Sequence, residues 1–360
     1  MKSKVPKVLH RVCGRSMLSW VLGTLEDLRG TGHVDEVMVV IGSGAEAVEA
    51  EVGARGACVV QEKRRGTGHA VMVAAPGIEA DEVLVLTADS PLITPLTLRR
   101  LCEAHREEGA AVTLLGAVLD DPTGYGRVIR DASGSVVGIV EETEAASDQK
   151  AVREVNTSTY VFRWDALREA LPRLRNDNAK GEYFLTDAVG ILAAEGGRGA
   201  AYVPPDPGEV LGVNSRAHLA RAQEIMRGRI NRRWMEEGVS MEDPSTVYID
   251  AEVSIGADTL LRPFVILEGA TAVGSGCRLG PNVRIVDSRL GDGVTVEQAT
   301  VRECELEEGV SVGPFASLRP GSLFRAGSKD GTFVETKKTE VGRGSKIHYL
   351  SYMGYARIGE

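Results

Sequence analysis

The sequence predicts an α/β domain with a mostly parallel sheet, then a linker helix, then a left-handed parallel β-helix of hexapeptide repeats. Three observations carry this prediction. Short β-rich runs alternate with amphipathic helical stretches up to about residue 214, one helical stripe covers residues 216–236, and an aliphatic residue then recurs at every sixth position. We therefore expect an α/β domain over residues 1–214, a linker helix over 215–238 and a β-helix over 245–360.

The first region reads as strand–helix units. Apolar residues at helical spacing predict a helix near the N-terminus; they are Met17, Leu18, Val21, Leu22, Leu25 and Leu28. Buried strands are predicted at 37–41, 59–60 and 83–86, with helices at 45–52 and 68–75 between them. Alternation of this kind is typical of a parallel sheet with helices on both faces, and ligands bind such sheets beyond the carboxyl ends of the strands.

The connecting segment has two unlike faces. One stripe is apolar and consists of Leu219, Ala222, Met226, Ile230 and Trp234, whereas the opposite face is rich in arginine. A basic helix can bind an acidic partner, but a solvated connector is the commoner case. We interpret this segment as a linker helix that ends at Gly238.

The hexapeptide period defines the last region. The aliphatic residues Ile249, Ile255, Leu261, Leu267, Val273, Leu279 and Ile285 follow one another at intervals of six, and the frame resets after them. Neither the period of a strand nor that of a helix generates a strict six. A hexapeptide β-helix does, because each aliphatic side chain fills the interior of a triangular coil. We expect about six coils, left-handed as in known proteins of this type.

Composition excludes several classes of protein. Of the 360 residues, 43% are apolar and 26% charged, which is typical of a globular chain. The net charge of −9 predicts no nucleic-acid partner, and no apolar stretch has the length of a signal peptide or membrane span. Five scattered cysteines show no metal-ligand spacing, so we expect reduced thiols and a cytoplasmic location.

Two glycine-rich segments follow predicted strands. Residues 42–47 fit a loose G-x-G-x-x-A dinucleotide fingerprint, with Glu62 about 20 positions on, but the favoured interpretation is a strand-to-helix turn that needs glycine. In residues 61–70, Gly66-Thr67-Gly68 opens a helix and lets a flat ring or phosphate approach the main chain. The amide of Gln61 can read a base edge. The alternative is again a turn.

A carboxylate follows the third predicted strand. Asp89 in the run 86–92 lies at the carboxyl end of that strand, where Mg²⁺ can take one or two protein oxygens together with substrate phosphates. An Asx turn before Pro91 is the alternative. Convergent polar groups also occur in the segments 121–127, 140–142, 154–157, 181–187 and 212–214.

The ordered set of these segments resembles a known family. PKVLH (6–10), QEKRRGTGHA (61–70), LTADSPL (86–92), DPTGYGR (121–127), GIVEE (138–142), EVNT (154–157), GEYFLTD (181–187) and GVNSR (212–216) precede the hexapeptide repeats. Together they closely resemble the bacterial bifunctional N-acetylglucosamine-1-phosphate uridyltransferases / glucosamine-1-phosphate acetyltransferases. The resemblance covers essentially the whole chain and implies an α/β nucleotidyltransferase fold for the first domain.

The resemblance implies roles for individual residues. Asp89 and Asn214 match the magnesium ligands, and Lys7 matches a phosphate-binding lysine. Gln61, Gly66 and Thr67 match the positions at which the family holds uracil, and Gly126, Glu141 and Asn156 match those at which it holds the acetamido sugar. In the second domain Arg319, Lys337 and Tyr352 match residues that bind the amino-sugar phosphate in the family.

The implied reaction is attack by N-acetylglucosamine-1-phosphate on the α-phosphorus of UTP, giving UDP-N-acetylglucosamine and pyrophosphate. Lys7, Asp89 and Mg²⁺ would provide positioning and electrostatics. The second domain would transfer an acetyl group from acetyl-CoA to glucosamine-1-phosphate. The resemblance further implies a homotrimer, a role in UDP-N-acetylglucosamine and peptidoglycan synthesis, and no nucleic-acid or membrane partner.

The chain departs from the family pattern at both ends. The family's first strand and its glycine-rich loop are missing, which would leave sheet edges unpaired, and the last coils are missing as well. We therefore expect little uridyltransferase activity from these 360 residues alone. At the family's histidine base stands Tyr349, with His348 one residue earlier and on the opposite side of a pleated strand. Tyr355 replaces an aspartate. His348 is therefore a candidate base or an isolated surface histidine.

Two other readings stay open. The missing loop, Tyr349 and Tyr355 favour a non-catalytic subunit of nucleotidyltransferase type, whereas Lys7, Asp89 and Asn214 oppose it. A nucleotidyltransferase for another sugar-1-phosphate is the other alternative.

Overall fold

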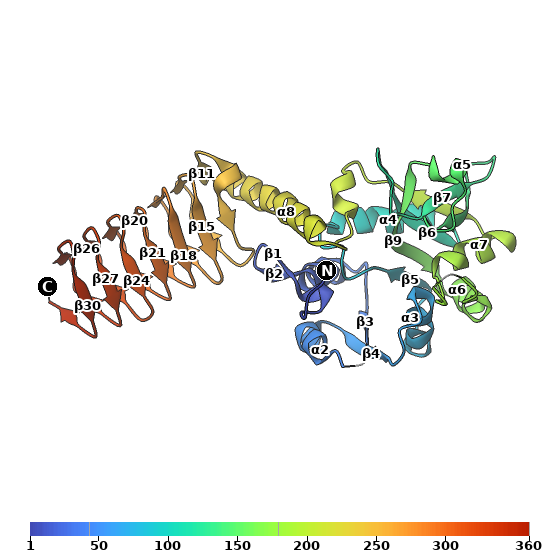
Figure 1. The fold of residues 1–360 in the computed structure, drawn as a ribbon, viewed down its shortest axis with the longest axis horizontal. Coiled ribbons are helices and arrows are strands. Elements are labelled where there is room, and N and C mark those ends of the chain that lie inside the picture. Colours follow the sequence, from blue (N-terminus) through green and yellow to red (C-terminus); the bar gives the residue numbers. More distant parts are fainter. Residues whose placement is uncertain (43, 179, 360) are drawn as a thin grey trace. The chain divides into compact units, whose positions relative to one another are not determined.

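The computed structural model describes residues 1–42, 44–178 and 180–359, so Ser43 of the predicted glycine turn and Glu360 lie outside the described residues. It contains two compact units (Figure 1). The first unit comprises residues 1–10 and 16–222, and the second comprises residues 11–15 and 223 onward. The fold class predicted from the sequence is confirmed in both units.

The elements before residue 214 follow the predicted strand–helix alternation. The helices are α1 (Met17–Gly30), α2 (Glu46–Val52), α3 (Thr67–Ala74), α4 (Pro95–Glu107), α5 (Ser147–Lys150), α6 (Trp164–Ala170) and α7 (Thr186–Ala194). The strands are β1 (Arg11–Val12), β2 (Arg15–Ser16), β3 (Met38–Gly42), β4 (Ala57–Gln61), β5 (Glu82–Val85), β6 (Val112–Val118), β7 (Arg127–Arg130), β8 (Val136–Val140), β9 (Glu154–Arg163) and β10 (Gly199–Tyr202).

The central sheet of the first unit has the order β10-β6-β9-β7-β8, and β5 also pairs with β9. The β3–β4 and β10–β6 pairs are parallel, whereas β9 runs antiparallel to β5, β6 and β7. The strand–helix alternation did not predict these antiparallel pairs. Their origin is the short hairpin at 131–135 between β7 and β8, because a hairpin reverses the chain without a helical crossover.

Two helical layers cover this sheet. On one face α1 and α4 contribute Leu28, Leu98 and Leu101 to a core shared with β6 and β9. On the other face α3, α6 and α7 pack against the opposite sides of the same strands, with Phe162 fully buried. A third cluster joins α1 and α2 to β3. In the described residues no ladder connects β3 to β5.

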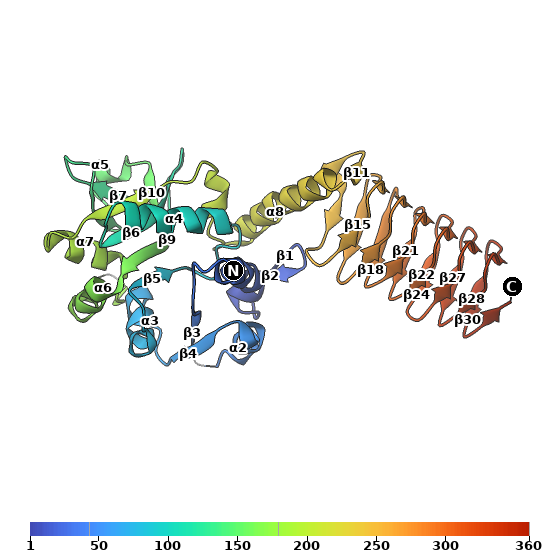
Figure 2. The same cartoon turned by 180° about the vertical axis from the view of Figure 1, so that it is seen from behind.

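The second unit forms three parallel sheets of seven strands each, as expected for a hexapeptide β-helix (Figure 2). The strands of these sheets follow α8 (Arg216–Glu236) in the sequence. The first sheet contains β11 (Ser240–Met241), β14 (Leu260–Leu261), β17 (Arg278–Leu279), β20 (Thr295–Val296), β23 (Ser311–Val312), β26 (Lys329–Asp330) and β29 (Lys346–Ile347). Each sheet has seven strands, one more than the six coils predicted.

The other two sheets complete the coils. The second contains β12 (Tyr248–Ile249), β15 (Val265–Glu268), β18 (Val283–Val286), β21 (Thr300–Arg302), β24 (Ser317–Arg319), β27 (Glu335–Lys337) and β30 (Tyr352–Gly354). The third contains β13 (Ser254–Ile255), β16 (Ala272–Val273), β19 (Arg289–Leu290), β22 (Glu305–Leu306), β25 (Leu323–Phe324), β28 (Glu340–Val341) and β31 (Arg357–Ile358).

The register explains the predicted period and its reset. Tyr248 pairs with Ile266, a step of one full coil of three hexapeptides, whereas Arg289 pairs with Glu305 in a coil two residues shorter. The aliphatic residues of the period are buried, and Leu261, Leu267 and Leu279 have no exposed surface. Each hexapeptide therefore contributes one side chain to the interior, as predicted.

Candidate functional site

Three side chains from distant parts of the sequence meet in the first unit. Lys7 begins a short 3₁₀ turn, Asp89 lies in the loop after β5, and Asn214 precedes α8. The Lys7 Nζ donates to Asn214 Oδ1 at 2.8 Å and forms an ion pair with Asp89 Oδ2. The Val213 N–H donates to the Asp89 carbonyl at 2.9 Å, which holds the segment before Asn214 beside this loop. The structure thus brings these predicted residues together.

The two oxygens at this point fit a magnesium ion. Asp89 and Asn214 both direct a side-chain oxygen at the same ammonium group, so a carboxylate and an amide converge where a cation already sits. Hard oxygen donors suit Mg²⁺, which often takes only one or two protein ligands and completes its shell with water and phosphate oxygens. Within the described ranges no group of three His, Cys, Asp or Glu side chains offers a different metal site.

Two further residues, which the sequence analysis did not single out, shape the loop opposite Asp89. Tyr125 is half-buried; burial, followed by the charge of Asp89, raises the pKa of its phenol. Arg127 in β7 is only 2% exposed, donates to the Tyr125 carbonyl and forms a 2.7 Å ion pair with Glu142. The buried guanidinium therefore ties the 121–127 loop to the segment after β8. Both residues belong to the motif DPTGYGR, so this motif was the feature of the sequence that could have identified them.

The glycine-rich motif 61–70 forms a second cluster at the end of β4. The Gln61 Nε2 donates to the Gly66 carbonyl at 3.2 Å and lies 2.8 Å from His69 Nδ1. Gly66 has a φ of +99°, and a Cβ there would meet the Tyr183 carbonyl at 2.5 Å. This position therefore requires glycine, and the tight turn that it permits places Thr67 at the start of α3.

The residues predicted for the acetamido sugar form a third group. Asn156 in β9 is buried, donates from its backbone N–H to the Gly126 carbonyl at 2.9 Å and donates from Nδ2 to the Tyr160 hydroxyl at 2.7 Å. Glu141 follows β8, and burial raises the pKa of its carboxyl. A Cβ on Gly126 would approach Ile139 to 3.0 Å, so little side-chain volume is available at this position.

The segment before and at the start of α7 connects the second and third groups. The Leu185 N–H donates to the Thr67 hydroxyl at 3.0 Å, and the Gly68 N–H donates to the Tyr183 carbonyl at 2.8 Å. On the other side the Thr186 hydroxyl reaches Glu141 at 3.5 Å. The motif GEYFLTD was quoted in the sequence analysis without roles, and the structure shows that its backbone contacts one predicted binding segment and its Thr186 side chain contacts the other.

In the second unit the predicted phosphate-binding residues share one sheet. Arg319 in β24 pairs in register with Lys337 in β27, and Tyr352 lies one strand further on in β30. The Arg319 guanidinium forms a 2.7 Å ion pair with Glu335. Tyr355 receives the cations of Lys337 and Lys338 over its ring at 5.5 and 5.6 Å, and hydrogen bonding and charge from Lys337 lower the pKa of its phenol.

His348 lies apart from this row of side chains. It is exposed and follows β29, which belongs to a different sheet from β24, β27 and β30. Tyr349 next to it is 70% exposed. The backbone at 347–349 passes over Gly331, where an added Cβ would meet the Tyr349 nitrogen at 2.9 Å. His348 therefore follows a strand of one sheet, whereas Arg319, Lys337 and Tyr352 lie on strands of another.

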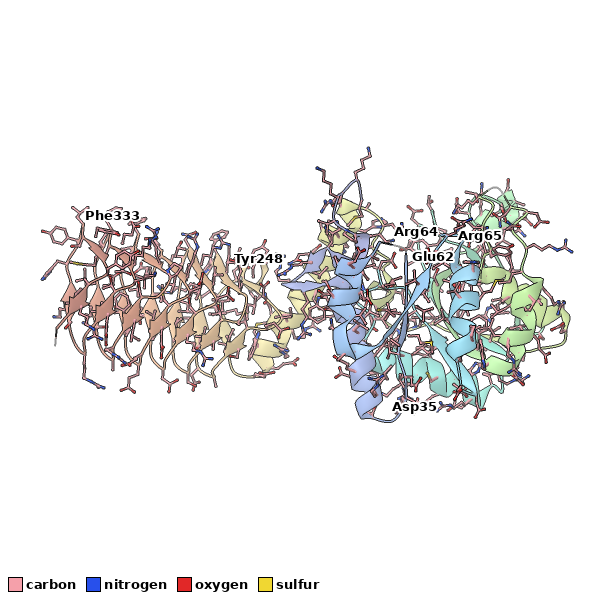
Figure 3. The ribbon with its side chains drawn as sticks, turned by 90° about the horizontal axis from the view of Figure 1, so that it is seen from below. Asp35, Glu62, Arg64, Arg65, Tyr248 and Phe333 are labelled. Atoms are coloured by element: carbon pink, nitrogen blue, oxygen red, sulfur yellow. The ribbon has the colours of Figure 1, made fainter. Side chains whose placement is uncertain are left out.

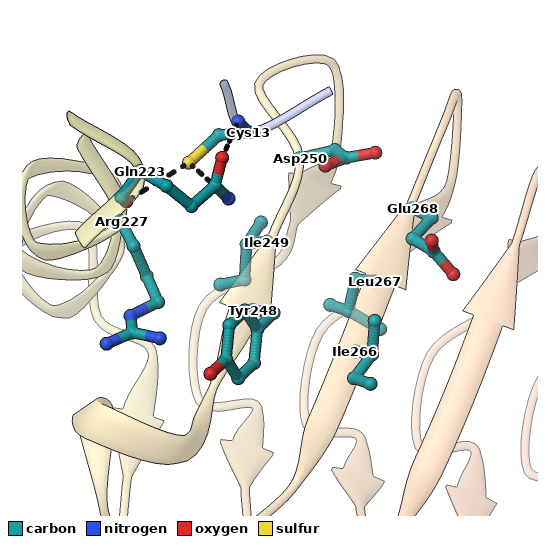
Figure 4. Close-up of a pocket in the computed structure, with 9 residues that line it drawn as sticks. All are labelled: Cys13, Gln223, Arg227, Tyr248, Ile249, Asp250, Ile266, Leu267 and Glu268. Carbon is teal, nitrogen blue, oxygen red and sulfur yellow. Dashed lines mark hydrogen bonds between the residues drawn. The ribbon is translucent and has the colours of Figure 1, made fainter. Parts of the chain in front are cut away.

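A cavity of about 210 Å³ in the second unit contains none of the predicted site residues (Figure 4). Cys13, Arg227, Tyr248 and Asp250 line it, and the Cys13 N–H donates to Gln223 Oε1 at 2.9 Å. Burial raises the pKa of the Cys13 thiol to about 12, so this thiol stays protonated at neutral pH and is a poor nucleophile. All five cysteines of the chain are free, as expected for reduced thiols.

Comparison with known proteins extends these observations. Residues 1–237 match the family model described as MobA-like NTP transferase domain. The chain is 45% identical over 362 residues to the bifunctional protein GlmU of Heliobacterium modesticaldum, with 100% of this chain and 78% of that protein covered. It is 47% identical over 361 residues to the bifunctional protein GlmU of Caldanaerobacter subterraneus subsp. tengcongensis, with the same coverage.

A solved structure shows the same fold over part of the chain. A UDP-glucose pyrophosphorylase complexed with UDP-glucose matches with a TM-score of 0.52 and 14% identity, covering 62% of this chain and 91% of that one. Within the described ranges, none of the helices combines the length and the apolar character needed to span a bilayer.

Proposed function

Since the chain belongs to the family of bifunctional GlmU proteins and carries a MobA-like NTP transferase domain over residues 1–237, we propose that it transfers a uridylyl group from UTP to N-acetylglucosamine-1-phosphate. The products are UDP-N-acetylglucosamine and pyrophosphate. The observation that carries this proposal is the convergence of Lys7, Asp89 and Asn214 from three distant segments. These residues combine one cation with two oxygen donors, as chemistry on a triphosphate requires.

The proposed reaction is an in-line displacement. A phosphate oxygen of the sugar-1-phosphate attacks the α-phosphorus of UTP, the new P–O bond forms, and the bond to the β-phosphate oxygen breaks to release pyrophosphate. Lys7 binds the phosphates and reduces the repulsion between two anionic substrates, so the residues act by positioning and electrostatics. Magnesium bound at Asp89 and Asn214 would supply additional positive charge to the phosphates.

The base-binding role proposed for Gln61 follows from its hydrogen bonds. Its Nε2 already donates to Gly66 and faces His69, which fixes the orientation of the amide. The side-chain carbonyl is then available to accept from the N3–H of uracil. Gly66 and Thr67 would form the adjoining wall, because their backbone lies at the start of α3. A cytosine lacks this N–H and would be rejected.

For the sugar we propose contacts from Glu141, Asn156 and Gly126. The half-buried carboxylate of Glu141 would accept from sugar hydroxyls, and its position is supported by the Thr186 hydroxyl. Asn156 is held by the Tyr160 hydroxyl, and its backbone N–H donates to the Gly126 carbonyl. Two hydrogen-bonding side chains beside a small residue suit a hydroxyl-rich ring with an acetamido group.

The second unit is proposed as a glucosamine-1-phosphate N-acetyltransferase domain with acetyl-CoA as co-substrate. Arg319 and Lys337 would bind the phosphate, and the ring of Tyr352, which is 60% exposed, would cover the sugar. His348 is retained as the candidate base to be tested, since imidazole suits proton abstraction near neutral pH. Coenzyme A release by wild type and by His348→Asn would test this role, and equal rates would reject it.

The first test of uridylyl transfer is nucleotide binding. We expect UTP with Mg²⁺ to raise the melting temperature more than dTTP or GTP does. Asp89→Asn should lose the magnesium-dependent part of this increase, whereas Asp35→Asn, a matched change at an exposed position labelled in Figure 3, should keep it. Stronger stabilisation by dTTP would favour a nucleotidyltransferase for another sugar, and no stabilisation by any nucleotide would favour a non-catalytic subunit.

The second test is turnover. Pyrophosphate release, which we expect to be slow for these 360 residues, should require UTP, N-acetylglucosamine-1-phosphate and Mg²⁺ together, and Asp89→Asn should lower the rate further by about 100-fold or more. Release without the sugar phosphate, or an unchanged rate in the variant, would contradict the proposed roles.

We also propose that the protein is a homotrimer in the cytoplasm and serves peptidoglycan precursor synthesis. Support for self-association comes from exposed aromatic side chains at one corner of the β-helix. Phe264, Phe315 and Phe333 are each more than half exposed, and the rings of Phe315 and Phe333 stack at 4.9 Å. Figure 3 shows Phe333 at the surface of the second unit. A monomeric mass in light scattering would reject this proposal.

A further inference from the structure

One column of interior side chains in the β-helix contains a carboxylic acid. Along the first sheet, successive coils place Leu279, Val296, Val312, Asp330 and Ile347 in register. Every member of this column except Asp330 is aliphatic. The period of six also continues from Phe324 through Asp330 to Thr336, so the acid occupies an aliphatic position of the hexapeptide repeat rather than a corner.

Asp330 is buried without a hydrogen-bond partner. It is 4% exposed, and neither Oδ1 nor Oδ2 has a partner among the described residues. The hydroxyl of Ser328, on the same turn of the coil, is fully buried and also unpartnered. An ionised carboxylate in such surroundings loses its hydration without compensation, so the neutral form is favoured. Burial accordingly raises the pKa of Asp330 to about 7.

The elements around Asp330 present no compensating charge to it. On the flanking strands β23 and β29 the inward residues are Val312 and Ile347. The lysines of this sheet, Lys329 and Lys346, lie on the alternate, exposed face of their strands.

The other two walls of the coil are also uncharged on their inner side. Their buried inward residues are Leu318 in β24, Phe324 in β25, Thr336 in β27 and Val341 in β28, together with Ser322, Ser328 and Thr339 at the corners. None of these side chains is an acid, a base or a cation, and burial is the cause of the pKa shift.

We propose that Asp330 is a proton-operated latch that holds the coil β25–β26–β27 closed while it is neutral and loosens this coil when it ionises. The proton leaves to solvent, and the resulting carboxylate is hydrated only when the coil opens. In the open coil the acid titrates near its ordinary value. The closed state therefore binds the proton more tightly, and raising the pH shifts the equilibrium toward the open coil.

The latch lies close to a segment with a proposed binding role. Asp330 precedes β27 by one corner of the coil, and β27 carries Lys337. Opening would therefore loosen the strand that presents this lysine. The latch itself rests on the burial of Asp330 and not on the proposed function, so the two can fail independently.

The experiment is hydrogen exchange of backbone amides in peptides covering residues 323–347, measured by mass spectrometry from pH 5 to 8 and corrected for the intrinsic exchange rate. The opening constant of the wild-type coil should increase with pH by up to about tenfold per pH unit and level off near pH 7. Asp330→Asn should remove this slope. Asp330→Val should also remove it, and its coil should be more protected than the wild type at pH 8.

The matched control is Asp258→Asn, the same change at an exposed residue of the same unit, which should keep the wild-type slope. A flat wild-type profile, or the same slope in Asp330→Asn as in wild type, would overturn the proposal. If Asp330→Asn does not fold, Asp330→Val decides: a coil at pH 8 no more protected than the wild type, or an unchanged slope, also overturns it.

Discussion

The two units of this protein position functional side chains in different ways. In the first unit Lys7, Asp89 and Asn214 meet although more than 80 residues separate each from the next along the chain. In the second unit Arg319 and Lys337 are neighbours because their strands are one coil apart. In a periodic sequence, the number of residues between two side chains therefore determines whether they are neighbours. An α/β domain needs its whole sheet and loops to bring a site together.

The cores of the two units also differ, because one is built from contacts between neighbouring coils and the other from contacts between distant segments. The β-helix interior is a column of single aliphatic side chains, and each coil packs only against its neighbours, as in other repeat proteins. The core of the first unit is shared among α3, α6, α7 and four strands of a mixed sheet. Damage to one coil should therefore stay local, whereas damage to the sheet of the first unit should spread to its site.

Phe324→Ala should have the largest effect and tests the local character of the β-helix. Phe324 has no exposed surface, so the truncation leaves a cavity and should lower the free energy of unfolding of the second unit by about 3–5 kcal/mol. Binding of UTP at the first unit should stay unchanged. The measurement is denaturant unfolding together with nucleotide titration; a loss of UTP binding would show that the two units are not independent.

Lys7→Met should have the next largest effect, and it concerns binding rather than folding. Removing a charge-assisted contact to the phosphates should weaken UTP binding by about 10–100-fold, which corresponds to about 1.5–3 kcal/mol. Calorimetric titration of Mg²⁺ and UTP gives the dissociation constant. Lys4→Met, at an exposed position nearby in the sequence, should bind UTP like the wild type. Equal weakening in both variants would indicate a general charge effect.

Gly66→Ala tests the part of the first unit that depends on a backbone conformation. The φ of +99° and the 2.5 Å approach of a Cβ to the Tyr183 carbonyl should cost about 1–3 kcal/mol of unfolding free energy and weaken UTP binding. Gly134→Ala is the matched control, because its φ is +87° and nothing lies within 4 Å of its added Cβ. If both variants lose equal stability, the strain comes from φ alone and the close approach has no effect.

The smallest effect is expected at the outer face of the β-helix. Arg284 and Glu268 form an ion pair between adjacent coils, with side chains 46% and 32% exposed. Pairs of this kind contribute little, so Arg284→Gln should change the free energy of unfolding by less than about 1 kcal/mol. A loss comparable with that of Phe324→Ala would show that the outer ladders, and not the interior column, hold the coils together.

The regions of the fold with the most regular sequence period were predicted best. Six-residue spacing identified the interior positions Ile249 to Ile285, and the reset of the frame corresponds to coils shortened by one or two residues. The spacing missed Asp330 and Thr336, because a search for aliphatic residues passes over polar ones at interior positions. In the first unit the alternation identified β3, β4 and β5, but not the antiparallel pairs of β9, since strand direction depends on the connections.

For the candidate site, the sequence predicted which residues take part and in which order, but it did not predict the contacts that hold them in place. Asp89 followed a predicted strand, and Gly66 opened a predicted helix. The role of Arg127 in holding the Tyr125 loop depends on its ion pair with Glu142 in another segment, and the role of Leu185 in holding Thr67 depends on a hydrogen bond across 118 positions of the sequence. Such bonds leave no local pattern, because their partners are set by how the sheet and helices pack.

The sequence by itself determined the β-helix, the strand–helix alternation of the first unit and the kinds of side chain available for phosphate chemistry. These features depend on local periods and on residue chemistry, which are written in the order of the residues. Only the tertiary structure decided that Lys7 faces both Asp89 and Asn214, that His348 follows a strand of a different sheet from the one that contains Arg319, and that the side chain of Asp330 has no hydrogen-bond partner among the described residues. Which side chains meet, which stay apart and which are buried depends on how distant segments pack, and no single stretch of sequence contains that information.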